Sequence, residues 1–338
     1  MKIAVDAMGG DLAPLEIVKG AVSAAKQWVD LELILVGDAK QIEDVLAKSN
    51  DNPGNIRIHH ASEVVGMNES ATSAIRKKKD SSITQSVGLI ARGEAEAVVS
   101  AGNTGATVAA STVLLQTLEG VKRPGIAIIM PTGKGFCVII DAGANITCTP
   151  VHLLQYGVMA SVFSKYVLGI DNPKVGLLNV GEETTKGNDL VKEAHGLLFN
   201  SSLNFLGNIE GHEIFSKDVN IVVCEGFVGN SLLKFFEGLT ENFLTTFESE
   251  AKKDPETARG LQLCNPVLEK LRNKADYTEY GGAPLLGVDG ICIISHGRSN
   301  SKAVQNAIKE AAKFSKNDVN GRIISELKNL PQSVNNKI

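Results

Sequence analysis

Residues 95–116, AEAVVSAGNTGATVAASTVLLQ, contain the unit from which the fold of this chain can be predicted. A short run rich in alanine and valine stops at a glycine-rich turn, and a stretch with helical character follows. The same order recurs along the chain, with strands and turns at 2–11, 136–145, 175–188, 220–230 and 291–300. Because strands and helices alternate, we predict an α/β fold with a largely parallel sheet and helices on both of its faces.

Every one of these glycine-rich turns follows the carboxyl end of a predicted strand. Ligands of open α/β sheets bind outside these ends, so the repeat predicts one cleft lined by several turns. Residues 98–105 and 222–229 also share the spacing VVxxGxxG. The shared spacing is compatible with two related halves, and equally with the general form of any strand–turn–helix unit.

The composition is that of an ordinary globular protein. Of 338 residues, 43% are hydrophobic and 21% are charged, which is enough to bury a sizeable core. The formal net charge of −4 argues against a basic nucleic-acid-binding protein. The one dense basic run, from Arg76 to Lys79, predicts either a solvated helix face or a docking surface for an acidic partner.

The five cysteines indicate reduced thiols. No CxxC pair occurs and the count is odd, so we expect neither a disulfide framework nor a zinc site. Cys137, Cys224 and Cys292 lie in apolar strands, which predicts buried, unreactive thiols. The chain opens on a strand without a signal sequence and holds no apolar run of transmembrane length, so we expect a cytoplasmic protein.

The turns offer groups that bind anions, but no familiar cofactor motif. Backbone N–H groups at a glycine turn and a helix N-terminus stabilise a phosphate without any cationic side chain. The chain has no GxxxxGK[ST] loop, no GxGxxG in its first turn and no GxSxG elbow. We therefore expect no cofactor and no metal, and a reaction in which the bound phosphate itself attacks. The residues that we expect to bind phosphate or substrate are Gly9, Gly10, Asn103, Thr104, Gly105, Gly143, Asn145, Gly187, Gly229 and His296.

Three side chains at strand ends could take part in the chemistry. Lys186, beside Gly187, could neutralise a phosphate or a developing oxyanion, or be an ordinary surface lysine. Asn230 could donate to a carbonyl oxygen in the cleft, or be the N-cap of the following helix. His296 could be a base or a phosphate ligand, or serve the structure alone.

Residues 232–280 depart from the repeat. A helical stripe of Leu232, Phe236, Leu239, Phe243 and Phe247 predicts a helical hairpin inserted into a single α/β catalytic domain of residues 1–338. The stripe fits a core or dimer-interface helix pair, or a surface that contacts an acyl chain or a membrane.

The chain resembles the bacterial phosphate acyltransferases of the PlsX type. The resemblance runs from MKIAVDAMGGDLAP through VVSAGNTGA, IDAGAN, NVGEETTKGN, CEGFVGN and YGGAPLLGV to ISHGRSNSKAV, in the family's order over residues 1–314. It implies a three-layer α/β/α sandwich on a mixed sheet, like isopropylmalate dehydrogenase and phosphate acetyltransferase. It also implies transfer of a long-chain acyl group from acyl carrier protein to inorganic phosphate, which supplies acyl phosphate for phospholipid synthesis.

The resemblance further implies a homodimer with peripheral membrane contact, and catalytic importance for Lys186 in KGN and Asn230 in GFxGN. The family's membrane-contact hairpin falls at about 239–280, where this chain reads CNPVLEKLRNKADY with few large apolar residues. Three other interpretations stay open: a short-chain acyltransferase that uses coenzyme A, a nicotinamide-dependent dehydrogenase of the same fold, and a non-catalytic scaffold of lipid synthesis. The dehydrogenase needs an acidic metal cluster that the sequence does not suggest, and the scaffold leaves Lys186 and Asn230 without a role.

Overall fold

A computed structural model describes residues 1–48, 53–275 and 281–335. Its described residues form an eleven-stranded sheet with the order β3-β2-β1-β4-β11-β10-β5-β6-β9-β7-β8. The strands are β1 (Lys2–Asp6), β2 (Glu32–Gly37), β3 (Ile56–His60), β4 (Ala97–Ser100), β5 (Gly125–Thr132), β6 (Gly135–Ile140), β7 (Lys174–Leu178), β8 (Asn204–Ile209), β9 (Ile221–Val223), β10 (Ala283–Leu286) and β11 (Ile291–Ile294).

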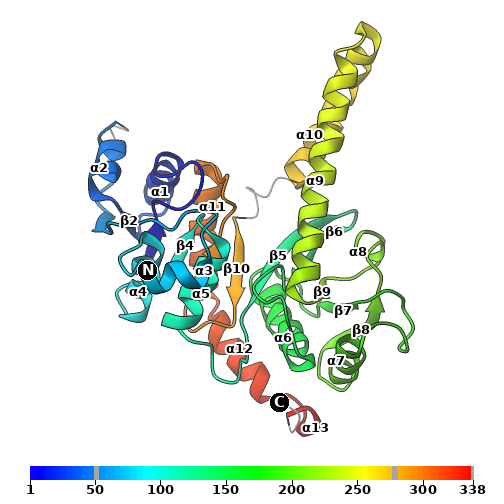
Figure 1. The fold of residues 1–338 in the computed structure, drawn as a ribbon. Coiled ribbons are helices and arrows are strands. Elements are labelled where there is room, and N and C mark those ends of the chain that lie inside the picture. The colour runs from blue at the N-terminus through cyan, green and yellow to red at the C-terminus, as the bar shows by residue number, and fades with distance from the viewer. Residues whose placement is uncertain (49–52, 276–280, 336–338) are drawn as a thin grey trace.

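Helices flank this sheet and extend from it (Figure 1). They are α1 (Leu15–Gln27), α2 (Ala39–Lys48), α3 (Ala71–Lys77), α4 (Ser82–Ala91), α5 (Thr104–Leu114), α6 (Pro150–Tyr166), α7 (Asp189–Phe199), α8 (Glu213–Ser216), α9 (Gly226–Ala251), α10 (Pro255–Ala275), α11 (Ser301–Lys316), α12 (Val319–Lys328) and α13 (Gln332–Asn335). Strand and helix thus alternate over most of the described chain, as the repeat predicts.

The alternation of side chains along each strand builds three layers. In β4, Ala97 and Val99 pack with residues of α1 and α11, whereas Val98 packs with residues of α4 and α5. In β6, Val138 and Ile140 pack with α6 and α7, whereas the intervening side chains pack with α8 and the start of α9. Both faces are therefore covered by helices, and the predicted α/β/α sandwich is confirmed.

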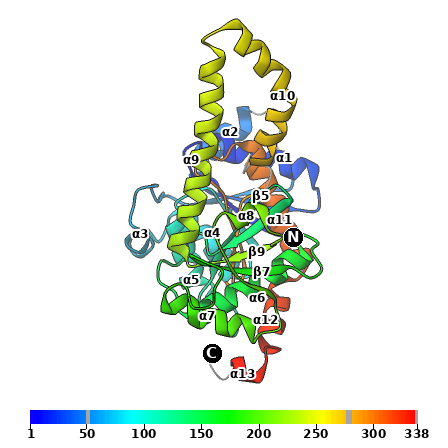
Figure 2. The ribbon, with the colours of Figure 1, turned by 90° about the vertical axis from the view of Figure 1, so that its right-hand side faces the viewer.

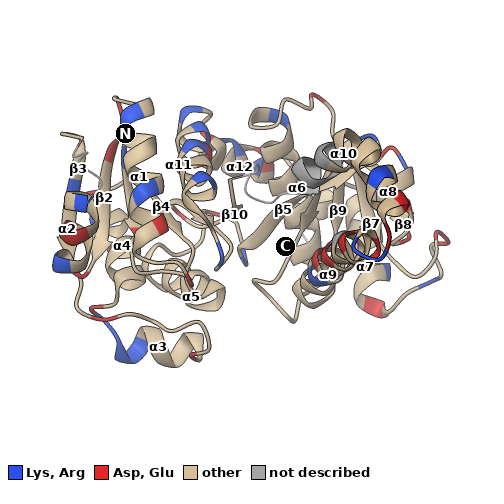
Figure 3. Ribbon diagram, turned by 90° about the horizontal axis from the view of Figure 1, so that it is seen from above, with Lys and Arg blue, Asp and Glu red and all other residues tan. Residues whose placement is uncertain are grey.

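The sheet is mixed, and its two parallel sets run in opposite directions. β1, β2, β3, β4 and β11 are parallel to one another, and so are β6, β7, β8 and β9. Between the two sets lie β10 and β5, which join their neighbours through antiparallel pairs. Figure 3 shows the two sets side by side with β10 and β5 in the middle. The repeat alone gave no sign of this reversal.

The reversal brings the carboxyl ends of both sets together. Ser100 at the end of β4 pairs with Ile294 at the end of β11, and Ile294 pairs with Ala283 of β10. β10 begins to pair with β5 two residues later, and Ile140 at the end of β6 pairs with Ala127 of β5. Because the sets approach from opposite directions, the turns after β4, β11 and β6 face each other across β10 and β5.

The predicted helical hairpin is formed by α9 and α10, which project from the body of the molecule (Figures 1 and 2). It starts at Gly226, six residues before the predicted boundary, and the last five residues of the predicted insertion lie outside the described residues. Phe236 packs into the core and stacks on Phe215, but Phe235 and Phe243 are exposed. None of the helices in the described part of the chain is both long and apolar enough to cross a membrane.

Candidate active site

A cavity of about 410 Å³ lies where the strand ends meet. β5 and β10 form its apolar floor, and residues from the turns after β4, β6 and β11 and from the first turns of α9 form its walls. The residues that line it from these turns and from α9 include Thr104, Gly105, Gly143, Asn230, Ser295, His296 and Ser299. The structure therefore brings several turns together in one cavity, as the repeat predicts.

A second groove, of about 640 Å³, continues from this cavity along α9. The two share apolar residues of β5, together with Leu233, Lys234, Glu237 and His296. The groove then follows α9 outward past Thr240 to Glu248. A long, flexible substrate could lie in this groove with its reactive end in the cavity.

The turn after β4 presents the N-terminus of α5 to the cavity. Thr104 and Gly105, the first two helical residues, both line it. Asn103 serves the turn itself, because its Oδ1 accepts from Ala106 N at 2.9 Å and its Nδ2 donates to the carbonyls of Gly66, Met67 and Glu69. The Asn103 amide, expected to contact phosphate, is thus held by the protein, while the helix N-terminus beside it faces the cavity.

The turn after β6 is organised by the fully buried Asp141. Its carboxylate accepts from the N–H groups of Gly143, Ala144 and Asn145 at 3.1, 2.9 and 2.7 Å, and from Ile126 N at 3.0 Å. The protein's own carboxylate therefore occupies the N–H groups of this turn, while Gly143 itself lines the cavity. Burial raises the pKa of Asp141, and these N–H donors oppose that effect.

Two residues of this turn have separate tasks. The Asn145 amide donates to Pro124 O at 2.6 Å and to Tyr156 Oη at 2.9 Å, so it secures the turn and is not offered to a ligand. Gly143 lines the cavity with φ +125°, and a Cβ added there would lie 3.4 Å from Asn230 Cβ. The glycine lets the asparagine side chain pack directly on the turn.

The first turn of the chain supports the cavity without lining it. A Cβ on Gly9 would lie 2.5 Å from Asp6 Oδ2, and one on Gly10 would lie 2.9 Å from Gly297 O. Asp6 is buried and accepts from Ser100 Oγ at 2.7 Å, and burial raises its pKa. Gly9 and Gly10, expected to bind substrate, therefore pack the turns together behind the cavity.

The two halves repeat this arrangement of a carboxylate against a glycine. Gly102, after β4, lies against Asp6 of the neighbouring strand, and a Cβ there would be 3.2 Å from Oδ2. Gly226, after β9, lies in the same way against Asp141, with a corresponding distance of 2.7 Å. The likeness of residues 98–105 and 222–229 thus extends to their packing, which supports two related halves.

Asn230 lies inside a helix and lines the cavity. The N-cap of α9 is Glu225, whose carboxylate accepts from Phe227 N at 2.7 Å and Val228 N at 3.1 Å, so the N-cap interpretation of Asn230 is wrong. The neighbouring Gly229 allows α9 to press on the turn after β6, because a Cβ there would lie 1.9 Å from Asp141 O. Gly229 therefore positions the helix that carries Asn230.

His296 lines both the cavity and the groove. Its Nδ1 accepts from Arg298 N at 3.1 Å, which leaves the proton of the neutral ring on Nε2. Burial lowers the pKa of His296. The imidazole is therefore a neutral donor near pH 7 and not a fixed cation.

Two residues that we did not single out from the sequence also line the cavity. The side chains of Ser295 and Ser299, on either side of His296 and Gly297, are 5% and 1% exposed. Neither hydroxyl finds a hydrogen-bond partner among the described residues. Their position after a strand in ISHGRSN was the only signal, and serine is also common in turns.

Lys186 lies outside both the cavity and the groove. It is exposed on the loop between β7 and α7, and Asn179 Nδ2 donates to its carbonyl at 3.2 Å. Gly187, with φ +89°, packs on the same asparagine, since a Cβ there would lie 2.4 Å from Asn179 Oδ1. The structure thus does not bring Lys186 and Gly187 together with the other predicted residues.

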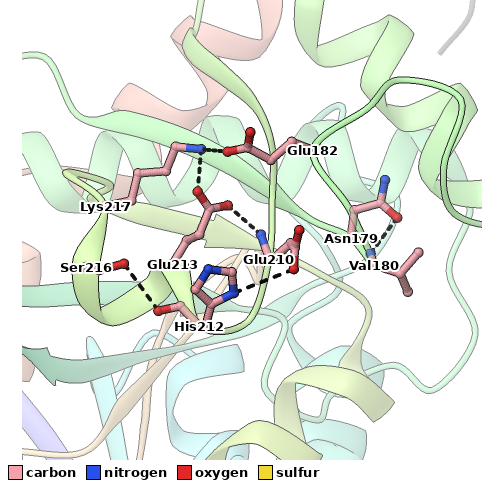
Figure 4. A network of polar contacts seen from close by, with 8 residues as sticks. All are labelled: Asn179, Val180, Glu182, Glu210, His212, Glu213, Ser216 and Lys217. Atoms are coloured by element: carbon pink, nitrogen blue, oxygen red, sulfur yellow. Dashed lines mark hydrogen bonds and ion pairs between the residues drawn. The ribbon is translucent and has the colours of Figure 1, made fainter.

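A polar network holds the loop of residues 179–188 on the protein (Figure 4). Lys217 Nζ forms ion pairs with Glu182 at 2.6 Å and with Glu213 at 2.9 Å. The buried Asn208 donates through Nδ2 to Glu183 O at 3.1 Å. The backbone that carries Lys186 is therefore fixed from two sides.

The three strand cysteines are buried as predicted, and the basic run is only partly a solvated surface. Cys137, Cys224 and Cys292 are buried, and burial raises the pKa of Cys137 and Cys292 to about 12. In the basic run, Lys78 is bound to Glu69 and to Val64 O, whereas Arg76 and Lys79 are exposed. These buried thiols are poor nucleophiles, and part of the run serves the structure.

Comparison with known proteins gives a family and a fold. The profile of a family described as fatty acid synthesis protein matches residues 1–322. A phosphate acyltransferase of Geotalea uraniireducens (strain Rf4) is 48% identical over 327 residues, which cover 97% of this chain and 94% of that protein.

Solved structures with this fold are more distant. A phosphotransacetylase from Streptococcus pyogenes superimposes with a TM-score of 0.60 at 17% identity, over 93% of this chain and 94% of that one. A 4-hydroxythreonine-4-phosphate dehydrogenase from Klebsiella pneumoniae gives 0.51 at 15% identity, over 92% and 98%. At these identities the likeness concerns the fold alone.

Proposed function

The chain belongs to the fatty acid synthesis protein family and is a phosphate acyltransferase, and we propose that it moves a long-chain acyl group from acyl carrier protein to inorganic phosphate. The product is an acyl phosphate that serves phospholipid synthesis. The observation that carries this proposal is the cavity at the strand ends and its continuation along α9. Such a shape accommodates a small anion at the inner end and a long thioester in the groove.

We propose direct displacement as the mechanism. An oxygen of hydrogen phosphate attacks the thioester carbonyl carbon, the carbon–sulfur bond breaks, and the phosphate proton ends on the released thiol. The high pKa values of the buried Cys137 and Cys292 support a mechanism without a cysteine acyl-enzyme. Because both reactants are held in one cavity, proximity supplies a large part of the rate.

Asn230 is proposed to stabilise the oxyanion of the tetrahedral intermediate. Its side chain lines the cavity, and we find no partner for its amide among the described residues. A donor aimed at a developing oxyanion contributes about 10²–10³ in rate. Lys186 is proposed to neutralise the phosphate, a role which demands that its ammonium reach the phosphate oxygens in the complex with substrate.

The acidic carrier protein is proposed to dock on α3. Exposed Arg76, Lys77 and Lys79 lie on or next to the C-terminal end of this helix, and Figure 3 shows basic residues at that end. Ala71 at the start of α3 approaches Gly105 of the cavity wall, since a Cβ on Gly105 would lie 3.1 Å from Ala71 Cβ. Charge reversal at Arg76 and Lys79 should weaken the apparent affinity for acyl carrier protein.

We further propose a cytoplasmic homodimer that contacts the membrane peripherally. The support is the exposed apolar surface of the hairpin, which includes Phe235, Phe243, Leu263 and Val267. Isolated exposed apolar side chains need no explanation, but several on one projecting hairpin favour an interaction surface.

The test compares two acyl donors. The protein is mixed with phosphate and either long-chain acyl carrier protein or the matching acyl-coenzyme A, and acyl phosphate is trapped with hydroxylamine. We expect hydroxamate mainly from the carrier-protein thioester. Equal or faster reaction with acyl-coenzyme A would instead support the coenzyme A-dependent alternative, and no hydroxamate from either donor would contradict the proposed function.

A further inference from the structure

We propose that phosphate binds at the inner end of the cavity, on the hydroxyls of Ser295 and Ser299 and the N-terminus of α5, while the thioester lies on the α9 side. This inference rests on the proposed function for the identity of the anion. It assigns separate places to the two substrates.

The two serine hydroxyls are the first observation. Both residues are more than nine-tenths buried, both line the cavity, and neither hydroxyl has a partner among the described residues. Buried polar atoms are nearly always hydrogen-bonded, and leaving one unpaired costs stability. Two such hydroxyls on one cavity wall therefore indicate a polar ligand that accepts hydrogen bonds from them.

The N-terminus of α5 is the second observation. The N–H groups of Ala106 and Thr107 bond to Asn103, but those of Thr104 and Gly105 have no partner within the helix. Thr104 and Gly105 are also the two helix residues that line the cavity. Free N–H groups at the positive end of a helix favour an anion over a neutral ligand.

These two groups of donors lie on the same wall. Ser295 N donates to Ser100 O at 2.8 Å, which ties the turn after β11 to the end of β4, just before α5 begins. Ser299 N donates to His296 O at 2.9 Å, so the second serine is held in the same short turn. The hydroxyls and the helix end are thus presented together by two adjacent parallel strands.

The α9 side of the cavity is less favourable for phosphate, because the ammonium of its lining lysine, Lys234, is already paired with a carboxylate. It carries Glu237, which is paired with Lys234 at 2.8 Å, and the apolar Leu233, all on α9. These three residues also line the outer groove. A thioester with its apolar chain fits this side, and Asn230 on the same helix is then placed at its carbonyl.

The experiment measures phosphate binding and turnover in Ser295→Ala, Ser299→Ala and the double variant. Loss of a hydrogen bond to a charged ligand should raise the KM for phosphate about tenfold or more in each single variant. The KM for acyl carrier protein thioester should change less than about twofold, because the donor lies on the other wall. In parallel, phosphate alone should raise the Tm of the wild-type protein and not that of the double variant.

Ser164→Ala is the matched control. Ser164 is also fully buried with an unpartnered hydroxyl, but it lies on α6 and outside the cavity, so its KM for phosphate should stay at the wild-type value. Unchanged phosphate KM in both single serine variants, or a rise in the KM for the thioester alone, would overturn the assignment. A wild-type protein that phosphate stabilises but that forms no acyl phosphate would leave the subsite standing and reject the proposed function. If the double variant does not fold, the single variants decide.

Discussion

At the scale of single residues, the structure separates side chains that face the substrates from those that hold the turns. The cavity is lined by Asn230, Thr104 and His296. In contrast, the side-chain amides of Asn103 and Asn145 donate hydrogen bonds to backbone carbonyls and to a tyrosine. Asparagines that follow strand ends occur in both groups. Only the hydrogen-bond partners distinguish them.

Replacement of Asn230 by alanine tests its role as oxyanion donor. We expect kcat to fall about 100-fold with little change in either KM, because the amide acts mainly in the transition state. The fold should persist, since Asn230 is exposed on α9. Asn242→Ala, an exposed asparagine on the same helix, is the control. An Asn230→Ala variant with a raised KM and an unchanged kcat would show instead that Asn230 contributes to substrate binding in the ground state.

Replacement of Lys186 by alanine tests its proposed role in catalysis. Because Lys186 is exposed, its loss should not disturb the packing of the protein. A catalytic role predicts a loss of acyl phosphate formation of at least about 100-fold with unchanged Tm. Lys192→Ala on the nearby α7, also exposed, should be silent in both measurements. Near-normal turnover in Lys186→Ala would mean that the lysine is only part of the surface.

At the scale of elements, the position of α9 depends on Gly229. A Cβ there would lie 1.9 Å from Asp141 O, so Gly229→Ala must push the helix away from the turn after β6. We expect a loss of about 1–3 kcal/mol in the free energy of unfolding, measured by urea denaturation, together with reduced kcat. Gly238→Ala on the same helix meets no atom within 4 Å and should instead stabilise by up to about 1 kcal/mol. Equal stability in the two variants would contradict the packing described for α9.

The loop of residues 179–188 depends on Lys217. Lys217→Met removes both ion pairs, and we expect less than about 1 kcal/mol of lost stability because these pairs are partly exposed. If Lys186 acts in catalysis, kcat should nevertheless fall severalfold as the loop loosens. Lys174→Met breaks a comparable exposed pair with Asp218 at the other end of β7 and should leave kcat unchanged. Equal kcat values in the Lys217→Met and Lys174→Met variants would show that the polar network around Lys217 does not contribute to catalysis.

At the scale of the molecule, the sequence predicts the alternation of strands and helices, the covered sheet and the hairpin. It does not predict that β6 to β9 run against β1 to β4, because a strand's direction depends on its pairing partners and not on its own pattern. Since one sheet runs through both sets, we propose that residues 1–338 work as one catalytic domain.

The site was predictable in outline only. Glycine turns at strand ends correctly indicated a cavity, but spacing cannot show that Asp141 already occupies the N–H groups of its turn. Ser295 and Ser299 could not be predicted from the sequence, because a buried hydroxyl without a hydrogen-bond partner is visible only in the three-dimensional structure. The donors that face the cavity are therefore one helix end and a few side chains, whereas the glycine turns mainly pack the surrounding elements together.

The measurement closest to the central claim follows thiol release from long-chain acyl carrier protein under single-turnover conditions, with and without phosphate. Direct displacement predicts no thiol release without phosphate. With phosphate, it predicts one thiol released for each acyl phosphate trapped. A burst of thiol in the absence of phosphate would reveal an acyl-enzyme, and thiol release without acyl phosphate would show that phosphate is not the acceptor.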